Sequence, residues 1–356
     1  MPTPAPFIMV TCQVGAETVL KQEVARRWPD FRFAYSRPGF VTFKLPEELR
    51  LAEDFKLRSI FARSHAFSIA KAEGPTDEER VRRFWEVCTE HQRDRSFDRI
   101  HVWERDTKVP GHDGFEPGIS ERAKEVHRLL MDHVPDGVEL HPAARVLTRP
   151  ARRGQTVLDC CIVEPDAWWI GVHRTRTFSS CRPGGLLSLT LPDNVVSRAW
   201  LKMEEGLRWA QLPIKEGHTV AELGSAPGGA SQALLARGCH VLGIDPAAMD
   251  EQVLADPNFC HIRSRSNQVP RRAYRKVQWL TADMNVAPNY TLDAVEDIVL
   301  RKDTKIRGLL LTLKLADWEL VEHIDDYLAR IQAWGFATVR ARHLQFNRQE
   351  ICVTAK

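Results

Sequence analysis

After about residue 190, apolar and polar positions follow one pattern. Short apolar runs alternate with amphipathic segments, which is the order of elements in a doubly wound α/β sheet with parallel strands. Ser197 is expected to cap the first helix of this half. Strands are predicted at 219–223, 240–244, 277–280 and 307–313, helices at 197–209, 230–237, 293–301 and 317–334, and a closing antiparallel pair near 336–340 and 349–354 on the edge of the sheet.

The first half mixes both periodicities, which predicts an α+β fold. Arg37-Pro-Gly39 is a turn sequence, because proline presets φ and glycine accepts a positive φ. A linker is predicted from Arg182 to Asp193, where proline and glycine are frequent. Strands are predicted at Phe7–Thr11 and Arg99–Glu104 and in the hairpins Phe31–Tyr35/Phe40–Phe43 and Gln155–Val163/Ala167–Arg174, and helices at Ala16–Trp28, Ala52–Phe61, Val81–Thr89 and Ser120–His133.

Composition narrows the class of protein. The 356 residues suit two or three domains. Lys and Arg number 50 against 47 Asp and Glu, a net charge of +3, so nucleic-acid binding would depend on local basic patches at 145–153, 173–176 and 263–276. Each patch alone is also typical of a solvated surface. No apolar run approaches the ~20 residues of a membrane span, and no signal-peptide pattern opens the chain. We therefore expect a soluble cytoplasmic protein that does not enter a membrane.

The eight cysteines and thirteen histidines show no metal-binding spacing. Cys160 and Cys161 are adjacent in an apolar run, as is typical of reduced core residues. No C-x-x-C or H-x-x-x-H pair occurs. The sequence therefore predicts no metal site.

A glycine-rich turn, Val220-Ala-Glu-Leu-Gly-Ser-Ala-Pro-Gly-Gly229, follows the first predicted strand of the second half. Gly224 stands where the backbone must turn sharply, and Gly228 and Gly229 remove side chains where a ligand can approach. The spacing is neither that of a dinucleotide-binding turn nor that of a P-loop, and so it suits a ligand without phosphate, such as S-adenosylmethionine. An ordinary tight turn is the alternative. Asp245, about 21 residues after Gly224, favours the cofactor, because a carboxylate there can accept hydrogen bonds from two ribose hydroxyls.

Four charged residues of this half lie at the ends of predicted elements, where ligands bind in an open α/β sheet. Lys202 lies on the helix before the first strand, Asp283 follows the strand at 277–280, Lys314 ends a very apolar strand, and Glu350 opens the last strand. Lys202 could be an exposed helix charge, Asp283 a helix cap and Glu350 an edge-strand charge. Lys314 is harder to explain in this way, because a lysine after a buried run needs partners or a shifted pKa.

With these residues in this order, the second half resembles the FtsJ-like family of S-adenosylmethionine-dependent RNA 2′-O-ribose methyltransferases, whose signature is a Lys-Asp-Lys-Glu tetrad on a Rossmann-like sheet. Within that family the chain is similar to the bacterial large-subunit ribosomal RNA methyltransferase M group, which methylates a cytidine ribose in 23S rRNA and has an N-terminal THUMP-type RNA-binding region. The similarity lies in Asp193–Glu205, the glycine turn, Asp283, Leu313–Leu315 and Asn347–Glu350. In the first half it depends on the order of elements and on Arg37-Pro-Gly39.

The resemblance implies three regions: 1–75, a ferredoxin-like α+β subdomain; 76–190, a THUMP-like RNA-binding domain; and 191–356, a Rossmann-like methyltransferase domain. It implies naked or partly assembled 23S rRNA as partner, contacted by Arg174 and Arg176, no metal, and a monomer. The catalytic residues would be Lys202, Asp283, Lys314 and Glu350, and the residues for S-adenosylmethionine Ser197, Glu222, Gly224, Ser225, Ala226, Pro227, Gly228, Gly229, Asp245 and Asp283.

The tetrad has a chemical logic in this setting. A ribose 2′-hydroxyl is a weak nucleophile, so a base must take its proton during attack. Lys314 can do so only when neutral, which requires its pKa to fall from about 10.4. We expect burial, Lys202 and the cofactor's sulfonium to lower it. Asp283 would then orient Lys314, and Glu350 would hold Lys202 or the substrate hydroxyl.

The chain departs from the family pattern at three points. Glu222 stands where the family has Asp, Ala230 follows the glycine pair in place of an aromatic residue, and Arg263-Ser-Arg265 lies where an adenine-contacting acid is expected. Two alternatives stay open. One is a nicotinamide-dependent oxidoreductase, favoured only by the strand, turn, helix and Asp unit. The other is a non-catalytic RNA-binding or ribosome-assembly factor that has kept the fold.

Overall fold

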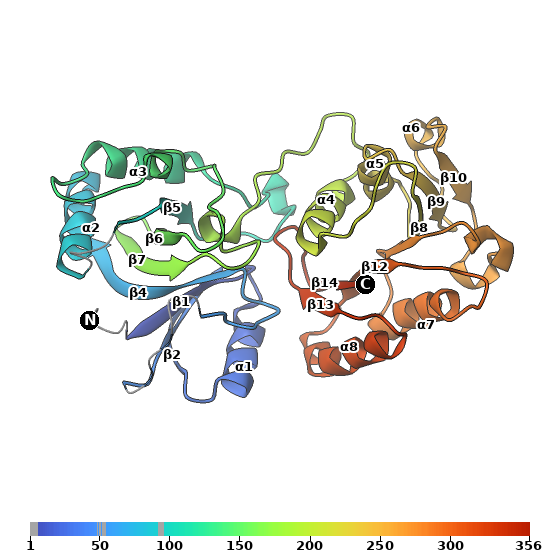
Figure 1. Cartoon of the computed structure of the whole chain (residues 1–356), viewed down its shortest axis with the longest axis horizontal. Helices are drawn as coiled ribbons and strands as arrows, with labels where there is room; N and C mark the ends of the chain where they lie inside the picture. Colours follow the sequence, from blue (N-terminus) through green and yellow to red (C-terminus); the bar gives the residue numbers. More distant parts are fainter. Residues whose placement is uncertain (1–5, 48, 50, 52–54, 92–95) are drawn as a thin grey trace. The chain divides into compact units, whose positions relative to one another are not determined.

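The computed structural model describes residues 6–47, 49, 51, 55–91 and 96–356. The chain forms two compact units, Met1–Ser188 and Leu189–Lys356. Each unit is built on one seven-stranded sheet (Figure 1). The boundary between the units falls inside the segment predicted as a linker.

The sheet of the first unit has the strand order β2-β3-β1-β4-β7-β6-β5. Its strands are β1 (Phe7–Thr11), β2 (Arg32–Arg37), β3 (Phe40–Lys44), β4 (Ser64–Glu73), β5 (Arg99–Glu104), β6 (Thr156–Glu164) and β7 (Ala167–Arg174). All neighbours pair antiparallel except β5 and β6, which are parallel. Because β4 pairs with both β1 and β7, one continuous sheet crosses residue 75. The division of this half into two subdomains stays a prediction.

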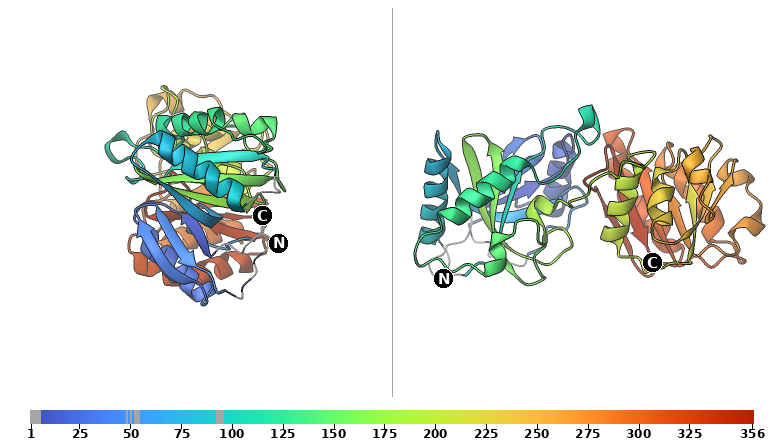
Figure 2. Two further views of the ribbon diagram at one scale, coloured as in Figure 1. Left: turned by 90° about the vertical axis from the view of Figure 1, so that its left-hand side faces the viewer. Right: turned by 90° about the horizontal axis from the view of Figure 1, so that it is seen from above.

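Two helices, α2 (Asp77–His91) and α3 (Glu121–Asp132), cover one face of this sheet, while α1 (Glu17–Arg27) packs on β2 and β3 (Figures 1 and 2). The covered face contributes Ile100, Leu158 and Trp168 to a core with Phe84 and Leu130. The opposite face carries a second, aromatic cluster whose members include Met9, Phe40, Trp103 and Trp169. Strand alternation therefore supplies apolar residues to both faces.

The α+β prediction is confirmed, including the hairpin at Arg37–Gly39, where Gly39 has φ +76°. The predicted helix Ala52–Phe61 is wrong for residues 55–61, which form no helix; Ala52–Asp54 lie outside the described residues. The reason is tertiary. The buried carboxylate of Glu23 accepts the Ile60 amide at 2.9 Å and the Phe61 amide at 3.4 Å, so these amides have partners without helical pairing.

The sheet of the second unit has the order β10-β9-β8-β11-β12-β14-β13. Its strands are β8 (Thr219–Leu223), β9 (His240–Ile244), β10 (Phe259–Ile262), β11 (Trp279–Ala282), β12 (Gly308–Lys314), β13 (Val339–Arg342) and β14 (Glu350–Ala355). The first five strands of this order are parallel and the last two antiparallel. The doubly wound α/β fold with an antiparallel pair at its edge is confirmed.

Helices α4 (Ala199–Ala210) and α5 (Gly229–Leu235) cover one face of this sheet, and α7 (Pro288–Val299) and α8 (Ile324–Ala333) cover the other (Figures 1 and 2). The short α6 (Glu251–Leu254) precedes β10. No helix among the described residues is long and apolar enough to cross a membrane.

Several boundaries differ from prediction. Helix α4 begins after Arg198, so Ser197 is not its cap. Helix α7 starts earlier than predicted, at Pro288, a residue preorganised for the first turn. The single helix predicted at 317–334 is a 3₁₀ segment, Trp318–His323, followed by α8. Strand β10 was not predicted, because none of its four residues is fully buried and they show no alternation.

Candidate active site

Four charged side chains of the second unit meet at the carboxyl edge of its sheet. Lys202 lies 3.1 Å from Glu350 Oε1 and also pairs with Asp283 Oδ2. Lys314 Nζ lies 2.9 Å from Asp283 Oδ1 and donates to Glu350 Oε2. Each lysine thus contacts both carboxylates. The four form a ring of alternating charge, which is called the tetrad below.

The strand topology explains why residues so far apart in sequence meet. Strands β11 and β12 are parallel neighbours, so Asp283, just after β11, and Lys314, at the end of β12, share one edge. Glu350 is the register partner of Lys314 in the antiparallel pair of β12 and β14. Lys202 reaches the same point from α4. Asn347 adds a hydrogen bond of 3.1 Å from its amide to Glu350 Oε1, a contact that sequence reasoning did not assign.

The tetrad controls its own protonation. Burial lowers the pKa of Lys314, but Asp283 and Glu350 outweigh burial and hold it above the ordinary lysine value. In the protein without a bound ligand, the pKa of Lys314 is therefore raised, whereas the sequence analysis predicted that it is lowered. The difference arises because two carboxylates contact Lys314, which the sequence could not show. Burial raises the pKa of Glu350, but Lys202 and Lys314 lower it to about 2. At neutral pH Lys314 is therefore an ammonium and Glu350 a carboxylate.

The glycine-rich turn between β8 and α5 is packed against the chain itself. Gly224 has φ +78°, and a Cβ there would lie 2.6 Å from the carbonyl oxygen of Asp283. A Cβ on Gly229 would overlap Ser197 Oγ and lie 2.6 Å from the Ser197 carbonyl oxygen, and one on Gly228 would meet Val253 at 2.6 Å. Sequence reasoning explained Gly228 and Gly229 by the approach of a ligand. In the structure, close packing against Val253 and Ser197 already requires glycine at both positions.

Two buried polar atoms beside this turn have no hydrogen-bond partner, Ser197 Oγ and Glu222 Oε1. The other oxygen of Glu222 accepts from Ser231 Oγ at 2.5 Å. Burial raises the pKa of Glu222 to about 8, although the Ser231 hydrogen bond lowers it. Because buried polar groups are nearly always paired, two unpaired polar atoms beside one turn are unusual.

The remaining residues predicted for the cofactor lie in the same turn. Asp245 accepts the Ala226 amide at 3.2 Å and the Ala247 amide at 2.8 Å, so its carboxylate fixes the turn. Ser225 is buried, with its hydroxyl 3.6 Å from the sulfur of Met249. Pro227 follows a cis peptide bond with Ala226.

A pocket of about 760 Å³ opens at this edge of the sheet. Of the residues predicted for the cofactor, Gly224 and Asp245 line it. Ile244 and Pro246, on either side of Asp245, also line it. Sequence reasoning assigned none of the remaining lining residues to the cofactor. They come from the loops after β10 and β11 and from α7: Ser264, Arg265, Ser266, Asn267, Met284, Asn285, Val286, Tyr290, Asp293, Ala294 and Asp297. Their position after strands could have identified them, because the loops that follow parallel strands gather at one edge of the sheet.

Arg174 and Arg176, predicted to contact RNA, lie in the first unit. With Lys56, Arg153 and Gly154 they line a surface hollow of about 410 Å³, called the basic hollow below. Arg174 Nε donates to the Gly154 carbonyl at 2.8 Å, which fixes the side chain. Four cations and no acid line the hollow, so it favours an anion such as phosphate.

A second basic surface lies in the second unit, between β10 and β11. Its cations are all exposed, while Tyr274 anchors the segment in the core. Arg275 lies 3.9 Å from Asp303. The cations are Arg263, Arg265, Arg271, Arg272, Arg275 and Lys276.

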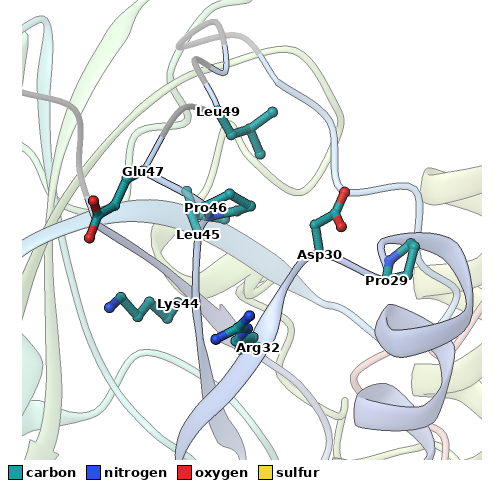
Figure 3. A pocket seen from close by; sticks show the side chains of 8 residues that line it. All are labelled: Pro29, Asp30, Arg32, Lys44, Leu45, Pro46, Glu47 and Leu49. Atoms are coloured by element: carbon teal, nitrogen blue, oxygen red, sulfur yellow. The ribbon is translucent and has the colours of Figure 1, made fainter.

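Another hollow, of about 690 Å³, lies beside β2 and β3 of the first unit (Figure 3). Arg32 and Lys44 lie in it together with Asp30 and Glu47. Cations and acids are balanced there, so the hollow selects no ligand by charge. None of the residues predicted from sequence to bind or react lies in it.

Comparison with known proteins gives the family of the second unit. Residues 195–322 match the FtsJ-like methyltransferase family. The chain is 27% identical to ribosomal RNA large subunit methyltransferase M of Xanthomonas euvesicatoria pv. vesicatoria over 362 residues, and this alignment covers 97% of each chain. It is 30% identical over 182 residues to the protein of the same name from Laribacter hongkongensis, which covers 48% of this chain and only half of that protein.

Among solved structures, TrmN from Thermus thermophilus aligns over 98% of this chain and 99% of its own, with 16% identity and a TM-score of 0.35. The family match spans α4, the glycine turn, Asp283 and Lys314. Residues 195–322 therefore form a domain of the FtsJ-like methyltransferase family.

Proposed function

We propose that this protein methylates the 2′-hydroxyl of a nucleotide, a cytidine, in large-subunit ribosomal RNA, with S-adenosylmethionine as methyl donor. The observation that carries this proposal is the tetrad of Lys202, Asp283, Lys314 and Glu350, closed by contacts of each lysine with both carboxylates. The choice of RNA is supported by the relatives named ribosomal RNA large subunit methyltransferase M, which align along nearly the whole chain. In bacteria ribosomal RNA lies in the cytoplasm, which agrees with the cytoplasmic location that the sequence predicts for this protein.

The residues beside the glycine turn fit the proposed cofactor. The Ser197 hydroxyl and Glu222 Oε1, which are buried without a partner beside the turn, would bind the polar amino-acid end once the turn moves to admit it, since neither residue lines the pocket. Asp245 would accept from the ribose, and the loop at Ser264–Asn267 would hold the adenine. Asn267 in that loop offers an amide donor and acceptor that could bind the edge of the adenine in place of a carboxylate. When bound, S-adenosylmethionine supplies an electrophilic methyl group on a positively charged sulfur.

Lys314 is the proposed base. Its Nζ would take the proton of the 2′-hydroxyl, which requires the neutral amine. In the protein alone Asp283 and Glu350 stabilise the ammonium. A positive charge placed against Asp283 would compete with Lys314 for this carboxylate and lower the pKa of the amine. The carboxylates therefore hold Lys314 in position before the reaction, and its deprotonation depends on what occupies the pocket.

Lys202, Glu350 and Asn347 are proposed to position the reacting groups. Lys202 contacts the same two carboxylates as Lys314. Because each carboxylate is shared between the two lysines, neither carboxylate fully neutralises the charge of Lys314. Asn347 fixes one oxygen of Glu350, which leaves the other for Lys314. Much of the rate gain would come from this fixed geometry, because holding two reactants in line removes most of the entropic barrier.

The first unit is proposed to present the RNA. Its basic hollow, with Arg153, Arg174 and Arg176, has the charge and exposure to contact phosphates. The THUMP-type character of this unit is part of the proposal. So is the preference for naked or partly assembled 23S rRNA, since the target ribose must be accessible.

The experiment is Lys314→Ala, with tritiated methyl transfer to 23S rRNA measured beside a titration of S-adenosylmethionine. Loss of the base should lower turnover by about 10²–10⁴-fold while cofactor affinity changes little. Lys305→Ala is the matched control, because Lys305 is exposed and precedes the same strand. Turnover of Lys314→Ala equal to that of Lys305→Ala would refute the assignment of the base.

The raised pKa of Lys314 favours a second candidate, an RNA-binding or ribosome-assembly factor that keeps the fold but not the reaction. Mass spectrometry of 23S rRNA from a deletion strain separates the two. Loss of one ribose methyl group supports the methyltransferase and identifies its nucleotide. An unchanged methylation pattern together with a defect in subunit assembly supports the second candidate.

A further inference from the structure

Three potential metal ligands meet in the core of the first unit, and none of them belongs to the tetrad or to the proposed cofactor site. One of them, His173, directly precedes Arg174 of the basic hollow. His101 lies on β5, Asp159 on β6 and His173 on β7. The register pairs His101 with Asp159, and His173 with Val157, two residues from Asp159 on the same face of the sheet. One ligand atom from each of the three lies within 4.8 Å of the others.

All three side chains are shut off from solvent, with His101 and Asp159 1% exposed and His173 4% exposed. His173 is fully paired: Nδ1 lies 2.5 Å from Asp159 Oδ2, and Nε2 lies 2.8 Å from the Ser180 carbonyl oxygen. His101 is different. Neither of its ring nitrogens has a hydrogen-bond partner, and Nδ1 lies 3.8 Å from Asp159 Oδ1, beyond a hydrogen bond.

An imidazole with two unpaired nitrogens is rare in a protein core. A neutral ring always has one N–H donor and one lone pair, and burial without partners for them is unfavourable. Because neither nitrogen is used by another group of the core, the lone pair of the ring is available as a ligand. The group it faces is the Asp159 carboxylate, an oxygen ligand.

We propose that His101, Asp159 and His173 bind one divalent transition metal ion, with zinc as the first candidate. Two imidazole nitrogens and one carboxylate oxygen form a donor set that such ions accept. The Ser180 carbonyl accepts a hydrogen bond from the Nε2–H of His173, which leaves Nδ1 as the nitrogen that can bind a metal in the cluster. This is the outer hydrogen bond that metal-bound histidines usually have.

Binding requires a small rearrangement. Ligand atoms around a tetrahedral zinc ion, with bonds of about 2.0–2.1 Å, lie roughly 3.3 Å apart. His101 and Asp159 are already near this separation at 3.8 Å, whereas His173 and Asp159 at 2.5 Å must move apart. The metal would replace the proton that His173 and Asp159 share, and that proton would leave to solvent.

The ion would be structural. The segment after β7 covers this face of the sheet through Ser180, bonded to His173, and Cys181, whose carbonyl accepts the Ala151 amide at 2.8 Å. A metal bound to β5, β6 and β7 would fix these strands and this segment together. Sequence analysis expected no metal, because the ligands are dispersed along the chain and meet only through strand pairing.

The test uses the full chain without an affinity tag, stripped of metal with a chelator and titrated with Co²⁺ and then Zn²⁺. We expect one equivalent of Co²⁺ with visible d–d absorption, its displacement by zinc, and a rise in the melting temperature of the metal-free protein. Asp159→Asn and His101→Gln should each weaken Co²⁺ binding at least 100-fold. His127→Gln is the control, since His127 is a buried histidine of the same unit outside the cluster.

The wild-type protein decides the matter even where a variant fails to fold. If it binds neither Co²⁺ nor Zn²⁺ with a dissociation constant below about 10 μM, the site does not exist and the cluster is a buried Asp–His pair. Binding that is unchanged in both Asp159→Asn and His101→Gln also overturns the proposal, because it would then come from other groups, such as the exposed thiol of Cys260.

Discussion

Glu350→Gln removes one charge of the tetrad while keeping the shape of the side chain. Glu350 is 5% exposed and contacts both Lys202 and Lys314. Glutamine resembles the protonated carboxyl, so the variant measures what ionised Glu350 contributes to the fold. It also leaves two ammonium groups with Asp283 alone.

The magnitude follows from the pKa of Glu350, which is lowered from 4.5 to about 2. Each pH unit of lowering corresponds to about 1.4 kcal/mol, so the variant should destabilise the second unit by roughly 3 kcal/mol at pH 7. The raised pKa of Lys314 describes the same contacts from the other side and is not added. A carboxyl group whose pKa is lowered on folding stabilises the folded state at pH values above its pKa in the unfolded chain. This stabilisation is lost as the pH falls through the pKa of the folded state. The difference should therefore be constant from pH 8 to 6 and about 1 kcal/mol smaller at pH 4.

Hydrogen exchange with mass spectrometry on the full chain follows β12 and β14 separately from the first unit. Opening of these strands should become about 100-fold more frequent in Glu350→Gln at pH 7. Glu322→Gln is the control, because Glu322 is an exposed residue of the same unit. Equal exchange in the two variants at pH 7, or a difference that grows toward pH 4, would show that the tetrad does not lower the pKa of Glu350.

Three further outcomes are expected. Gly229→Ala places a Cβ against Ser197 and should weaken S-adenosylmethionine binding at least tenfold by calorimetry; an affinity within twofold of wild type would contradict the packing of the turn. Glu222→Gln removes a carboxyl whose pKa is raised from 4.5 to about 8. As pH rises from 4.5 to 8, the stability of the wild type should therefore fall relative to that of the variant, by at most about 1.4 kcal/mol per pH unit. Hydrogen exchange of β8 without this pH dependence would contradict the raised pKa of Glu222. Replacing Arg153 and Arg174 by alanine should reduce the salt dependence of rRNA binding by about one unit of slope for each lost phosphate contact, and an unchanged slope removes the basic hollow from the RNA interface.

The fold of the second unit could be predicted because its central strands are apolar and its helices amphipathic. Strand β12, for example, is almost wholly buried, and such runs are typical of a parallel sheet covered on both faces. Strand β10 was missed because it is short and half-buried at the edge of the sheet. In the first unit, the helix predicted at Ala52–Phe61 is wrong over its described part because Glu23, on another element, takes the amide protons that a helix would have used.

The candidate site divides in the same way. The positions of Asp283, Lys314 and Glu350 at strand ends were visible in sequence, because strand ends follow from the apolar pattern. Lys202 was visible only as a polar residue inside a predicted helix, α4 in the structure. The contacts among the four residues were not visible, since these depend on the register of β12 and β14. The pocket loops after β10 and β11 were missed for a related reason: their residues have no motif and are gathered only by the sheet.

Charge balance in the tetrad depends on contacts that the sequence does not show, and the proposed reaction depends on this balance. Two ammonium and two carboxylate groups make the ring neutral, and a neutral, tightly paired ring holds every proton in place. Lys314 is therefore a poor base as long as Asp283 and Glu350 face only the two lysines. A further positive charge beside Asp283 gives the ring a net charge of +1, which is unfavourable in a half-buried site and is relieved when one lysine loses its proton. In this arrangement the carboxylates that raise the pKa of Lys314 also make that pKa sensitive to an incoming cation, so the base would become active only when the methyl donor is bound.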